Sequence, residues 1–600
     1  MKKLYLFLFF SLSILSTTTL LGGNKDGRIY MYARLTASQE VPAVNTKAKG
    51  LVTFILEEDG KTLSVHGVFD SLSGAVTNCH FHSGALGVNG GVVLNLLPLV
   101  KGNQISGKVT VTKAIVAAIS NYAIYINVHT AANTGGEMRG QVYMETDLHF
   151  GAIMSGAKEV PANTTTGSGL GSFVLNYAND KVEYKVLVTG LTGPITNAHF
   201  HYGDATRSGP VAYGLSYSGN TLTGTVDVSS AFVDSLFSNK VYINVHTAAN
   251  PAGEIRSQVG YTSQVAFDVM ANGANEVPAK VSSGKAIALG WMSPELDSLN
   301  YIVMYDSITP TNAHFHVGAA GVNGSVVIGF TAVAGSKYYS ARVGVKPDTL
   351  AKILRGDIYL NIHTAANTAG EIRGQTSTSV REGLVANLCG KQEIPAVNGT
   401  ALGAGLLTID RNKTLGHAEI VTNGLTGNAT AGHIHIGAKG ANGGVYVNLN
   451  ITGASGNAAS GLFSIARTTL ADSLINGLSY YNVHTAANGG GEIRGQIAKD
   501  VQNECLPVGT FELNGQQLNV KVFPNPLLDV LNLDFDSNDA FDAQMILSDL
   551  LGRPVLSKNM EILRGANQIN LPVSNLPNGI YFVQLRNSSR LLFTEKIVKE

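Results

Sequence analysis

The sequence predicts an all-β protein that consists of four copies of one domain followed by a smaller β domain. The tetrapeptide Glu-Val/Ile-Pro-Ala recurs at intervals of 119, 117 and 117 residues, beginning at Glu40, Glu159, Glu276 and Glu393. The 68 glycines and 17 prolines are typical of short strands joined by turns. A period of about 118 residues is too long for a solenoid repeat and suits a complete small domain. We therefore expect a tandem array of four β-sandwich-like domains, each with one short helix, and a small C-terminal Ig-like β-sandwich.

The composition is that of a folded chain without a dominant charge. Apolar residues make up 44% of the chain, and 42 basic residues balance 42 acidic ones. A protein that binds nucleic acid through its phosphates carries an excess of basic residues. The sequence therefore argues against nucleic acid as a partner.

Residues 1–22 have the pattern of a secretory signal peptide. Lys2 and Lys3 precede an apolar run over residues 4–15, and small residues then lead to Gly22. A membrane anchor is the alternative, but the run is short for a spanning helix, which needs roughly 18 or more apolar residues. No later segment has such a run, so we expect an exported chain without a transmembrane anchor after signal removal.

Alternation of polar and apolar residues indicates strands within each repeat. In the second repeat, Ser172–Tyr177 and Val182–Val188 flank an Asn-Asp turn, which predicts a hairpin. In the third repeat, Pro347–Leu354 has an acidic first turn and one apolar face, which predicts a short helix. Short strands at roughly ten-residue spacing favour a sandwich, with a barrel as the alternative. The motif proline is expected to end the opening strand, and a binding motif is the alternative interpretation.

These signals divide the chain into seven segments. The segments are a signal peptide (1–22), four repeats (23–143, 144–260, 261–378 and 379–500), a linker (501–517) and a C-terminal domain (518–600). Because the joins between repeats are short, we expect adjacent repeats to contact one another.

The chain contains three cysteines, Cys79, Cys389 and Cys505, which is too few for a disulfide framework. Cys389 and Cys505 are candidates for a disulfide that closes the fourth repeat. Free buried thiols are the alternative.

The histidines carry the clearest chemical signal. Twelve of the fifteen belong to the repeated motifs, which are a His-x-His motif and a later Tyr-x-Asn-x-His-Thr-Ala-Ala-Asn motif. Histidines at i and i+2 on a strand point to the same face, and a third from a neighbouring strand would complete a three-nitrogen metal site with one open position. Imidazole suits zinc and copper best. The candidate ligands are His80, His82 and His129; His199, His201 and His246; His314, His316 and His363; and His433, His435 and His484.

Three polar residues accompany the third histidine of each repeat: Asn two residues before it, Glu eight after it and Arg ten after it. These residues are Asn127, Glu137 and Arg139; Asn244, Glu254 and Arg256; Asn361, Glu371 and Arg373; and Asn482, Glu492 and Arg494. The Glu is a candidate fourth ligand or an acceptor for a ligand's N–H group, and the Glu of the Glu-Val/Ile-Pro-Ala motif is a candidate ion-pair partner of the Arg. The competing interpretation is a polar hydrogen-bonded ladder, used for structure or recognition, that binds no metal.

Catalytic motifs are otherwise missing from the sequence. It has no Gly-x-Ser-x-Gly elbow, no recurrent Cys/His pair and no His-Glu-x-x-His. His-x-His-x-Gly resembles copper–zinc superoxide dismutase only faintly, because the bridging histidine and the aspartate ligand of that enzyme are missing. The glycine-rich segment after His-x-His lacks Lys-Ser/Thr and opens no helix, so it predicts a turn. We expect a protein that is not an enzyme, with a metal-dependent redox enzyme as a minor alternative.

The repeated motifs resemble the CHRD domain, named after chordin and common in exported bacterial proteins. The resemblance rests on Glu-Val-Pro-Ala, Asn-Ala-His-Phe-His-x-Gly and Asn-Val-His-Thr-Ala-Ala-Asn-x-x-Gly-Glu-Ile-Arg-Gly-Gln, and it covers about residues 24–500. It implies extracellular β-rich domains. The fourth copy departs from the pattern, because Ala431 and Gly432 stand before its His-x-His motif.

The C-terminal segment resembles a different module. Val522-Phe-Pro-Asn-Pro526, Leu547-Ser-Asp-Leu-Leu-Gly-Arg-Pro554 and Leu576-Pro-Asn-Gly-Ile-Tyr581 are similar to the C-terminal sorting domain of the type nine (Por) secretion system of Bacteroidota. The resemblance implies contact with the type nine secretion machinery, transport across the outer membrane, and release or attachment at the cell surface. An unrelated Ig-like domain is the alternative.

Taken from sequence, the favoured function is an exported binding or adhesion protein without catalysis. Four linked copies favour multivalent attachment to an extracellular polysaccharide or protein. The alternative is a zinc- or copper-binding protein with one three-histidine site per repeat; no cofactor is certain from the sequence.

Overall fold

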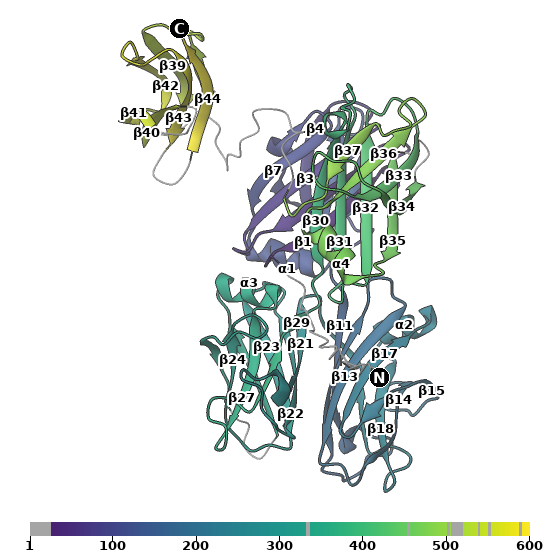
Figure 1. The fold of residues 1–600 in the computed structure, drawn as a ribbon. Coiled ribbons are helices and arrows are strands. Elements are labelled where there is room, and N and C mark those ends of the chain that lie inside the picture. The colour runs from purple at the N-terminus through teal and green to yellow at the C-terminus, as the bar shows by residue number, and fades with distance from the viewer. Residues whose placement is uncertain are drawn as a thin grey trace, which may run out of the picture. The chain divides into compact units, whose positions relative to one another are not determined.

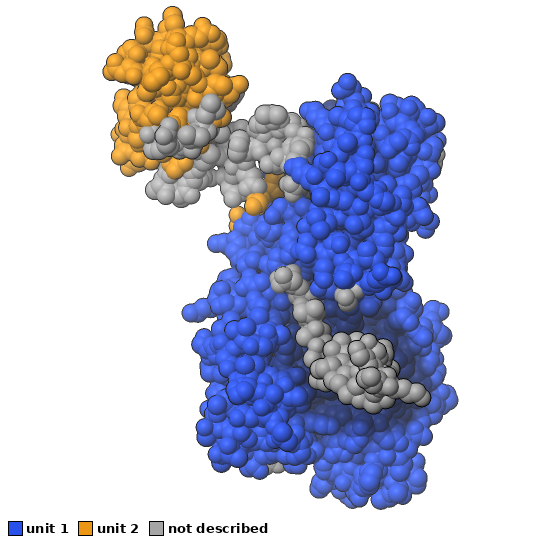
Figure 2. Space-filling model, in the orientation of Figure 1, with its two compact units in different colours: residues 1–106, 111–506 blue, residues 107–110, 507–600 orange. Residues whose placement is uncertain are grey.

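The computed structural model describes residues 26–331, 337–452, 457–500, 505, 520–537, 540–549, 554–586 and 591–600. The predicted signal peptide lies outside the described residues, as does most of the predicted linker. The chain divides into two compact units, one of residues 1–106 and 111–506 and the other of residues 107–110 and 507–600 (Figure 2). The first contains nearly all of the four repeats, and the second contains the C-terminal domain.

The first repeat is a ten-stranded antiparallel sheet with the order β5-β4-β8-β9-β1-β2-β3-β7-β6, and β10 pairs with β1 (Figure 1). Its strands are β1 (Ile29–Thr36), β2 (Lys49–Leu56), β3 (Thr62–Asp70), β4 (Val76–Ser83), β5 (Val92–Asn95), β6 (Val100–Lys101), β7 (Gln104–Thr110), β8 (Ile124–Thr130), β9 (Met138–Gln141) and β10 (Tyr143–Met144). A short helix, α1 (Lys113–Ser120), precedes β8.

The second repeat has the same order of strands, and the nine-stranded sheet of the third has this order without an equivalent of β6 among the described residues. The second contains β11 (Leu148–Ser155), β12 (Ser168–Leu175), β13 (Lys181–Thr189), β14 (Ile195–Tyr202), β15 (Val211–Gly214), β16 (Tyr217–Ser218), β17 (Thr221–Asp227), α2 (Ser230–Phe237), β18 (Val241–Thr247), β19 (Ile255–Gln258) and β20 (Gly260–Ser263). The third contains β21 (Ala266–Asn272), β22 (Lys285–Met292), β23 (Ser298–Asp306), β24 (Pro310–Val317), β25 (Val326–Gly329), β26 (Tyr338–Gly344), α3 (Pro347–Arg355), β27 (Ile358–Thr364), β28 (Ile372–Gln375) and β29 (Ser377–Thr378).

The sheet of the fourth repeat closes into a barrel with the order β30-β31-β32-β35-β34-β33-β36-β37. Its elements are β30 (Glu382–Cys389), β31 (Leu402–Ile409), β32 (Leu415–Asn423), β33 (Ala429–Ile436), β34 (Val445–Thr452), β35 (Ala458–Ser464), α4 (Thr468–Ile475), β36 (Ser479–Thr485) and β37 (Ile493–Gln496). The barrel closes because β34 is long enough to pair with both β33 and β35. The all-β prediction is confirmed, and in this repeat the barrel replaces the favoured sandwich.

The predicted hairpin and helix of the repeats are present. β12 pairs with β13 in the register Leu175↔Val182, and the inward side chains of both strands are buried in the core of the second repeat. α3 begins at Pro347 and ends at Arg355, and Gly356 follows it with a φ of 77°, a conformation that glycine adopts without strain.

The Glu-Val/Ile-Pro-Ala motif follows the opening strand and does not end it. β1 ends at Thr36, and a 3-10 turn over Ala37–Gln39 separates the strand from Glu40. The expectation that Pro42 ends this strand is therefore wrong. The turn forms there because the backbone N–H of Glu40 donates to the carbonyl of Ala37.

The repeats contact one another through apolar and charged side chains. Repeats two and three share a cluster that includes Leu187 and Leu289, and repeats one and four share one that includes Tyr30 and Val385. Buried ion pairs also connect the repeats. Arg381 of the fourth repeat pairs with Asp147 of the second, and Arg411 of the fourth pairs with Asp268 of the third, both at 3.2 Å. Contact between the first and fourth repeats was not expected from sequence.

Cys389 forms a disulfide with Cys505, whereas Cys79 is free and buried. The C-terminal domain has two sheets, β38-β39-β42 and β41-β40-β43-β44, around an apolar core. Its strands are β38 (Lys521–Phe523), β39 (Val530–Ser537), β40 (Phe541–Asp549), β41 (Pro554–Ile562), β42 (Gly565–Pro572), β43 (Gly579–Arg586) and β44 (Leu591–Lys599). Within the described part of the chain, no helix is both long and apolar enough to span a membrane.

Candidate metal centre

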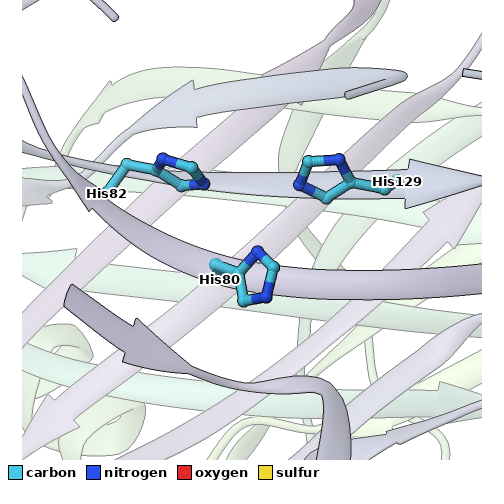
Figure 3. A group of neighbouring side chains, drawn as sticks. All are labelled: His80, His82 and His129. Carbon is cyan, nitrogen blue, oxygen red and sulfur yellow. The ribbon is translucent and has the colours of Figure 1, made fainter. Parts of the chain in front are cut away.

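The three histidines of the first repeat come together on two paired strands. His80 and His82 lie on β4, and His129 lies on β8, opposite Asn78. Because side chains alternate along a strand, the intervening Phe81 points into the core and the histidines point away from it. Each histidine offers one ring nitrogen, either Nδ1 or Nε2, and these three nitrogens lie within 4.8 Å of one another. Figure 3 shows the three rings around a common space.

The same convergence occurs in all four repeats, so the structure brings together every histidine that the sequence singles out. The three further clusters are His199, His201 and His246; His314, His316 and His363; and His433, His435 and His484. The register between the strands is the same each time, with His201 opposite Tyr242, for example, as His82 is opposite Tyr125. The departure at Ala431 and Gly432 does not disturb the fourth cluster.

Backbone carbonyl groups fix the proton on two of the three rings. Nδ1 of His82 donates to the carbonyl of Gly90 at 2.9 Å, and Nδ1 of His129 donates to the carbonyl of Thr134 at 3.0 Å. A neutral imidazole carries one proton, so Nε2 of both rings presents a lone pair. Nε2 of His82, Nε2 of His129 and Nδ1 of His80 are buried without a hydrogen-bond partner.

The other repeats keep this pattern with one difference. The second histidine of each donates from Nδ1 to the carbonyl of Gly209, Gly324 or Gly443, and its Nε2 is again buried and unpartnered. Nδ1 of the first histidine lies close to Nε2 of the third, at 3.2 Å for His199 and His246. The hydrogen bond between them requires a proton on one of the two nitrogens, and a metal ion bound to both would require that proton to move to the other nitrogen of its ring.

The surroundings of the rings favour their neutral form. Burial lowers the pKa of His80 below its usual range, and the adjacent His129 and His82 lower it further. Burial likewise lowers the pKa of His129, His199 and His246. Neutral imidazole is the form that binds metal ions, so protonation competes weakly with metal at neutral pH.

A stack of side chains supports the second histidine. The rings of His82 and Tyr125 are stacked, with their centroids 4.9 Å apart and an interplanar angle of 14°. The guanidinium carbon of Arg139 lies 3.5 Å from the centroid of the Tyr125 ring. Tyr125 is not among the candidate site residues predicted from the sequence, although a tyrosine recurs four residues before the third histidine in every repeat.

The segment over residues 84–91, which we call the glycine loop, forms a turn as predicted. Its Gly90 supplies the carbonyl that accepts from His82, and its N–H donates to the hydroxyl of Tyr125 at 3.2 Å. A Cβ atom at Gly90 would lie 1.4 Å from the carbonyl oxygen of Ser83, so only glycine fits at this position.

The structure does not bring Glu137, the candidate fourth ligand or acceptor, into the histidine cluster. Its carboxylate accepts from the hydroxyls of Thr130 (2.6 Å) and Ser73 (2.7 Å) and from the backbone N–H of Ser73 (2.8 Å). These hydrogen bonds lower the pKa of Glu137 despite its burial. The equivalent Glu254, Glu371 and Glu492 bind threonine hydroxyls in the same way. This glutamate therefore holds the connection between β3 and β4.

Asn127 and Glu40 form a second structural contact beside the cluster. The amide of Asn127 donates to the carboxylate of Glu40 at 3.4 Å, and Gly136 packs against both with a φ of 129°. Burial raises the pKa of Glu40 to about 7, while the charge of Arg139 acts in the opposite direction. Among the described residues, Glu40 and Arg139 do not form an ion pair within 4.0 Å. The predicted pairing of this glutamate with the arginine is therefore a longer-range attraction.

Comparisons with protein families account for nearly the whole described chain. The family model of the CHRD domain matches residues 31–142, 150–259, 267–376 and 384–497. The model of the secretion system C-terminal sorting domain matches residues 521–600.

The chain is also similar to individual proteins. It is 32% identical to chordin of Danio rerio over 281 residues, which is 43% of this chain and 30% of chordin, so it spans about a third of that relative. The solved structure of a tetra-tandem repeat from the extending region of a large adhesion protein aligns with 70% of this chain and 96% of that one, at 12% identity and a TM-score of 0.12. Salmonella alpha-2-macroglobulin reacted with methylamine aligns with 93% of this chain and 38% of that one, at 8% identity and a TM-score of 0.14. TM-scores this low do not indicate a shared fold.

Proposed function

The chain belongs to the CHRD domain family, and we propose that it is an exported metal-binding protein with one zinc or copper centre in each of its four repeats. Its C-terminal sorting domain indicates export by type nine secretion to the cell surface or the extracellular space. The observation that carries the proposal is the recurrence, four times, of three imidazole rings that each offer one nitrogen within 4.8 Å of the nitrogens of the other two.

The donor atoms fit a transition metal. Zinc and copper are bound by imidazole nitrogens, and a three-histidine set leaves one position open for water or another ligand. The carbonyl acceptors behind His82 and His129 are the kind of partner that fixes a ligand's tautomer and ring orientation. The cluster contains no thiolate or carboxylate among the described residues, which disfavours iron–sulfur, calcium and magnesium.

The competing interpretation, a polar ladder without metal, is less consistent with the unpartnered nitrogens. In a hydrogen-bonded network each buried acceptor faces a donor, because an unsatisfied buried polar group costs about 1–3 kcal/mol. Here lone pairs of His82 and His129 are buried with no donor. A metal ion would satisfy them together with the nitrogen of His80.

We also propose that the centres serve binding rather than catalysis. Many hydrolytic and proton-transfer sites place a carboxylate or another base beside the metal. The carboxylate of Glu137 is occupied by hydroxyl and amide donors, and that of Glu40 contacts Asn127. Neither carboxylate belongs to the histidine cluster, whose donor atoms are all imidazole nitrogens.

Metal analysis of the purified chain tests the proposal. After the chain is stripped with a chelator, reloaded with zinc or copper and desalted, we expect close to four equivalents, one for each cluster. His201→Ala should remove one equivalent, and His66→Gln, which alters a histidine outside the clusters, should remove none. Less than about half an equivalent in the unaltered chain would overturn the proposal.

Multivalent attachment is a second candidate function, favoured by the presence of four copies of one domain. The partner would be an extracellular polysaccharide or protein. Binding of the full chain to immobilised alginate and to gelatin, with and without metal, tests it. If the chain is an adhesin for one of these classes, it should bind tightly to alginate or to gelatin. If it binds neither, with or without metal, attachment to these two materials is contradicted.

A further inference from the structure

We propose that Arg139 and its equivalents Arg256, Arg373 and Arg494 are positioning residues of the metal centres. Each acts through a tyrosine ring and a loop to fix the second histidine of its cluster. The inference rests on the proposed function, because it assigns these arginines to metal affinity.

The burial of these arginines calls for an explanation. Their exposed fractions are 2%, 1%, 2% and 1%, for Arg139, Arg256, Arg373 and Arg494. Burying a charge is unfavourable unless it is compensated, and arginines in protein interiors usually pair with a carboxylate. Among the described residues, none of the four forms an ion pair within 4.0 Å. The compensation comes instead from backbone carbonyls and from the face of a tyrosine ring.

The first route to the histidine is the stack of rings. The guanidinium carbon lies 3.5 Å from the tyrosine centroid in every repeat. The same tyrosine is stacked on the second histidine, at 4.8 Å and 10° for Tyr242 with His201 and at 4.8 Å and 9° for Tyr480 with His435. The guanidinium packs on one face of the tyrosine ring, and the histidine ring is stacked on the same tyrosine. This packing restricts rotation of the histidine side chain.

The second route is the glycine loop. The guanidinium of Arg139 donates to the carbonyls of Ala85 (3.3 Å) and Val88 (2.7 Å) and to the side-chain oxygen of Asn89 (2.9 Å). The next residue, Gly90, provides the carbonyl that accepts from Nδ1 of His82. The arginine therefore fixes the loop one residue away from the atom that sets the histidine's tautomer.

Repeats three and four have the same contacts. Arg373 donates to Ala319, Val322 and Asn323, and Arg494 donates to Ala438, Ala441 and Asn442. In each case the following glycine, Gly324 or Gly443, accepts from the second histidine.

The second repeat departs from this arrangement at one position. Ser208 stands where the other repeats have asparagine, and Nη1 of Arg256 is buried without a partner. The other terminal nitrogen, Nη2, still donates to the carbonyls of Asp204 and Arg207. If the arginine positions the histidine, the second cluster should bind metal less tightly than the others, and an asparagine at position 208 should improve it.

The charge of the arginine acts against its positioning effect. The guanidinium of Arg256 lies on the tyrosine ring that is stacked on His201, so its positive charge is close to a ligand. A positive charge near the centre weakens binding of a divalent ion. Loss of the charge alone would tighten zinc binding, whereas loss of positioning would weaken it, so the two effects have opposite signs.

The test uses full chains with a single complete cluster. His201→Ala, His316→Ala and His435→Ala together leave only the first cluster complete, and Arg139→Lys, Arg139→Gln and the control Arg342→Gln are added to this background. Zinc affinity is measured by competition with a chromophoric chelator, and thermal unfolding is measured without metal. We expect both Arg139 variants to lose about 10- to 100-fold in zinc affinity and the control to lose none.

A reciprocal background keeps the test informative if Arg139 variants fold poorly. His82→Ala, His316→Ala and His435→Ala leave the second cluster, and Ser208→Asn should increase its zinc affinity. Unchanged affinity in the Arg139 variants, with only a lower melting temperature of the metal-free chain, would overturn the inference. Tighter zinc binding in Arg139→Gln alone would also overturn it. That result would mean that the arginine affects zinc affinity only through its positive charge and does not orient the histidine. If the backgrounds bind no zinc, the proposed function fails and the inference fails with it.

Discussion

Nδ1 of His199 lies 3.2 Å from Nε2 of His246, although the two histidines are 47 residues apart and lie on different strands, β14 and β18. Nδ1 of His246 already donates to the carbonyl of Pro251, so its Nε2 is an acceptor. The proton between the two rings therefore comes from His199. A metal ion that binds both nitrogens requires this proton to move to Nε2 of His199, and protonation of either ring to imidazolium would compete with the metal, which couples metal binding to pH.

Metal release on acidification is the first prediction. Burial lowers the pKa of His199 and His246 from their ordinary value of 6.5. Both rings then stay neutral at pH 6.5, and we expect zinc to be released only below that pH, as measured by dialysis over a pH series. Release that begins above pH 6.5 would contradict the assignment of these ligands.

The metal-free chain should show the matching stability effect. Because the folded-state pKa of these histidines is lowered, the unfolded chain binds more protons below pH 6.5, and the free energy of unfolding falls as the pH is lowered through that range. Thermal unfolding without metal measures this. Saturating zinc should remove most of the change, because the bound imidazoles cannot take up protons until the metal leaves.

Glu159→Gln tests the buried carboxyl beside the second cluster. Burial raises the pKa of Glu159 to about 7 from an ordinary 4.5, so the folded state binds more protons between these two pH values. The free energy of unfolding should therefore fall as the pH rises from 4.5 to 7, and the variant should lose this contribution. Denaturant unfolding at several pH values measures it. The control Glu295→Gln, at an exposed position, should keep the dependence of the unaltered chain; an unchanged profile in Glu159→Gln would refute the role of this carboxyl.

Glu254→Gln separates the scaffold from the centre. The carboxylate accepts from hydroxyls of Thr165, Thr192 and Thr247, and these hydrogen bonds lower its pKa to about 2. We expect the variant to lose about 1–3 kcal/mol in the free energy of unfolding and to keep its metal content. Because the folded pKa is lowered, this stabilisation should fade as the pH falls below 4.5. Loss of one metal equivalent would instead make Glu254 a ligand.

Thiol counting tests the disulfide. Cys389 and Cys505 are bonded across 116 residues of sequence, and Cys79 is free. Titration of the denatured, unreduced chain should therefore find one thiol. Cys505→Ser should lower the free energy of unfolding of the fourth repeat by about 4 kcal/mol, because a cross-link over a long loop restricts the unfolded chain. Three thiols in the unreduced chain would contradict the bond.

The sequence was sufficient for the histidine clusters because two local rules determine them. A spacing of two residues places His80 and His82 on one face of a strand, and recurrence of the motif in four repeats identified His129 as their companion. The repeats, the hairpin over β12 and β13, and helix α3 follow from equally local patterns.

The roles of the neighbouring residues depend on contacts that no local pattern determines. Glu137 has the spacing of a possible ligand, but its partner Ser73 lies 64 residues earlier in the chain. The stack of Arg139 on Tyr125 depends on the register between β8 and β9. Closure of the fourth sheet depends on the length of β34, and the packing of the first repeat on the fourth depends on faces far apart in sequence.

X-ray absorption at the zinc edge of the fully loaded chain reports the ligands of the bound ions themselves. We expect three imidazole nitrogens per zinc at about 2.0–2.1 Å, without a sulfur ligand, together with the multiple scattering that histidine rings produce. His201→Ala should lower the amount of zinc bound and leave the average environment of the remaining ions unchanged. A spectrum dominated by oxygen ligands, or by fewer than two imidazoles per zinc, would contradict the three-histidine centre.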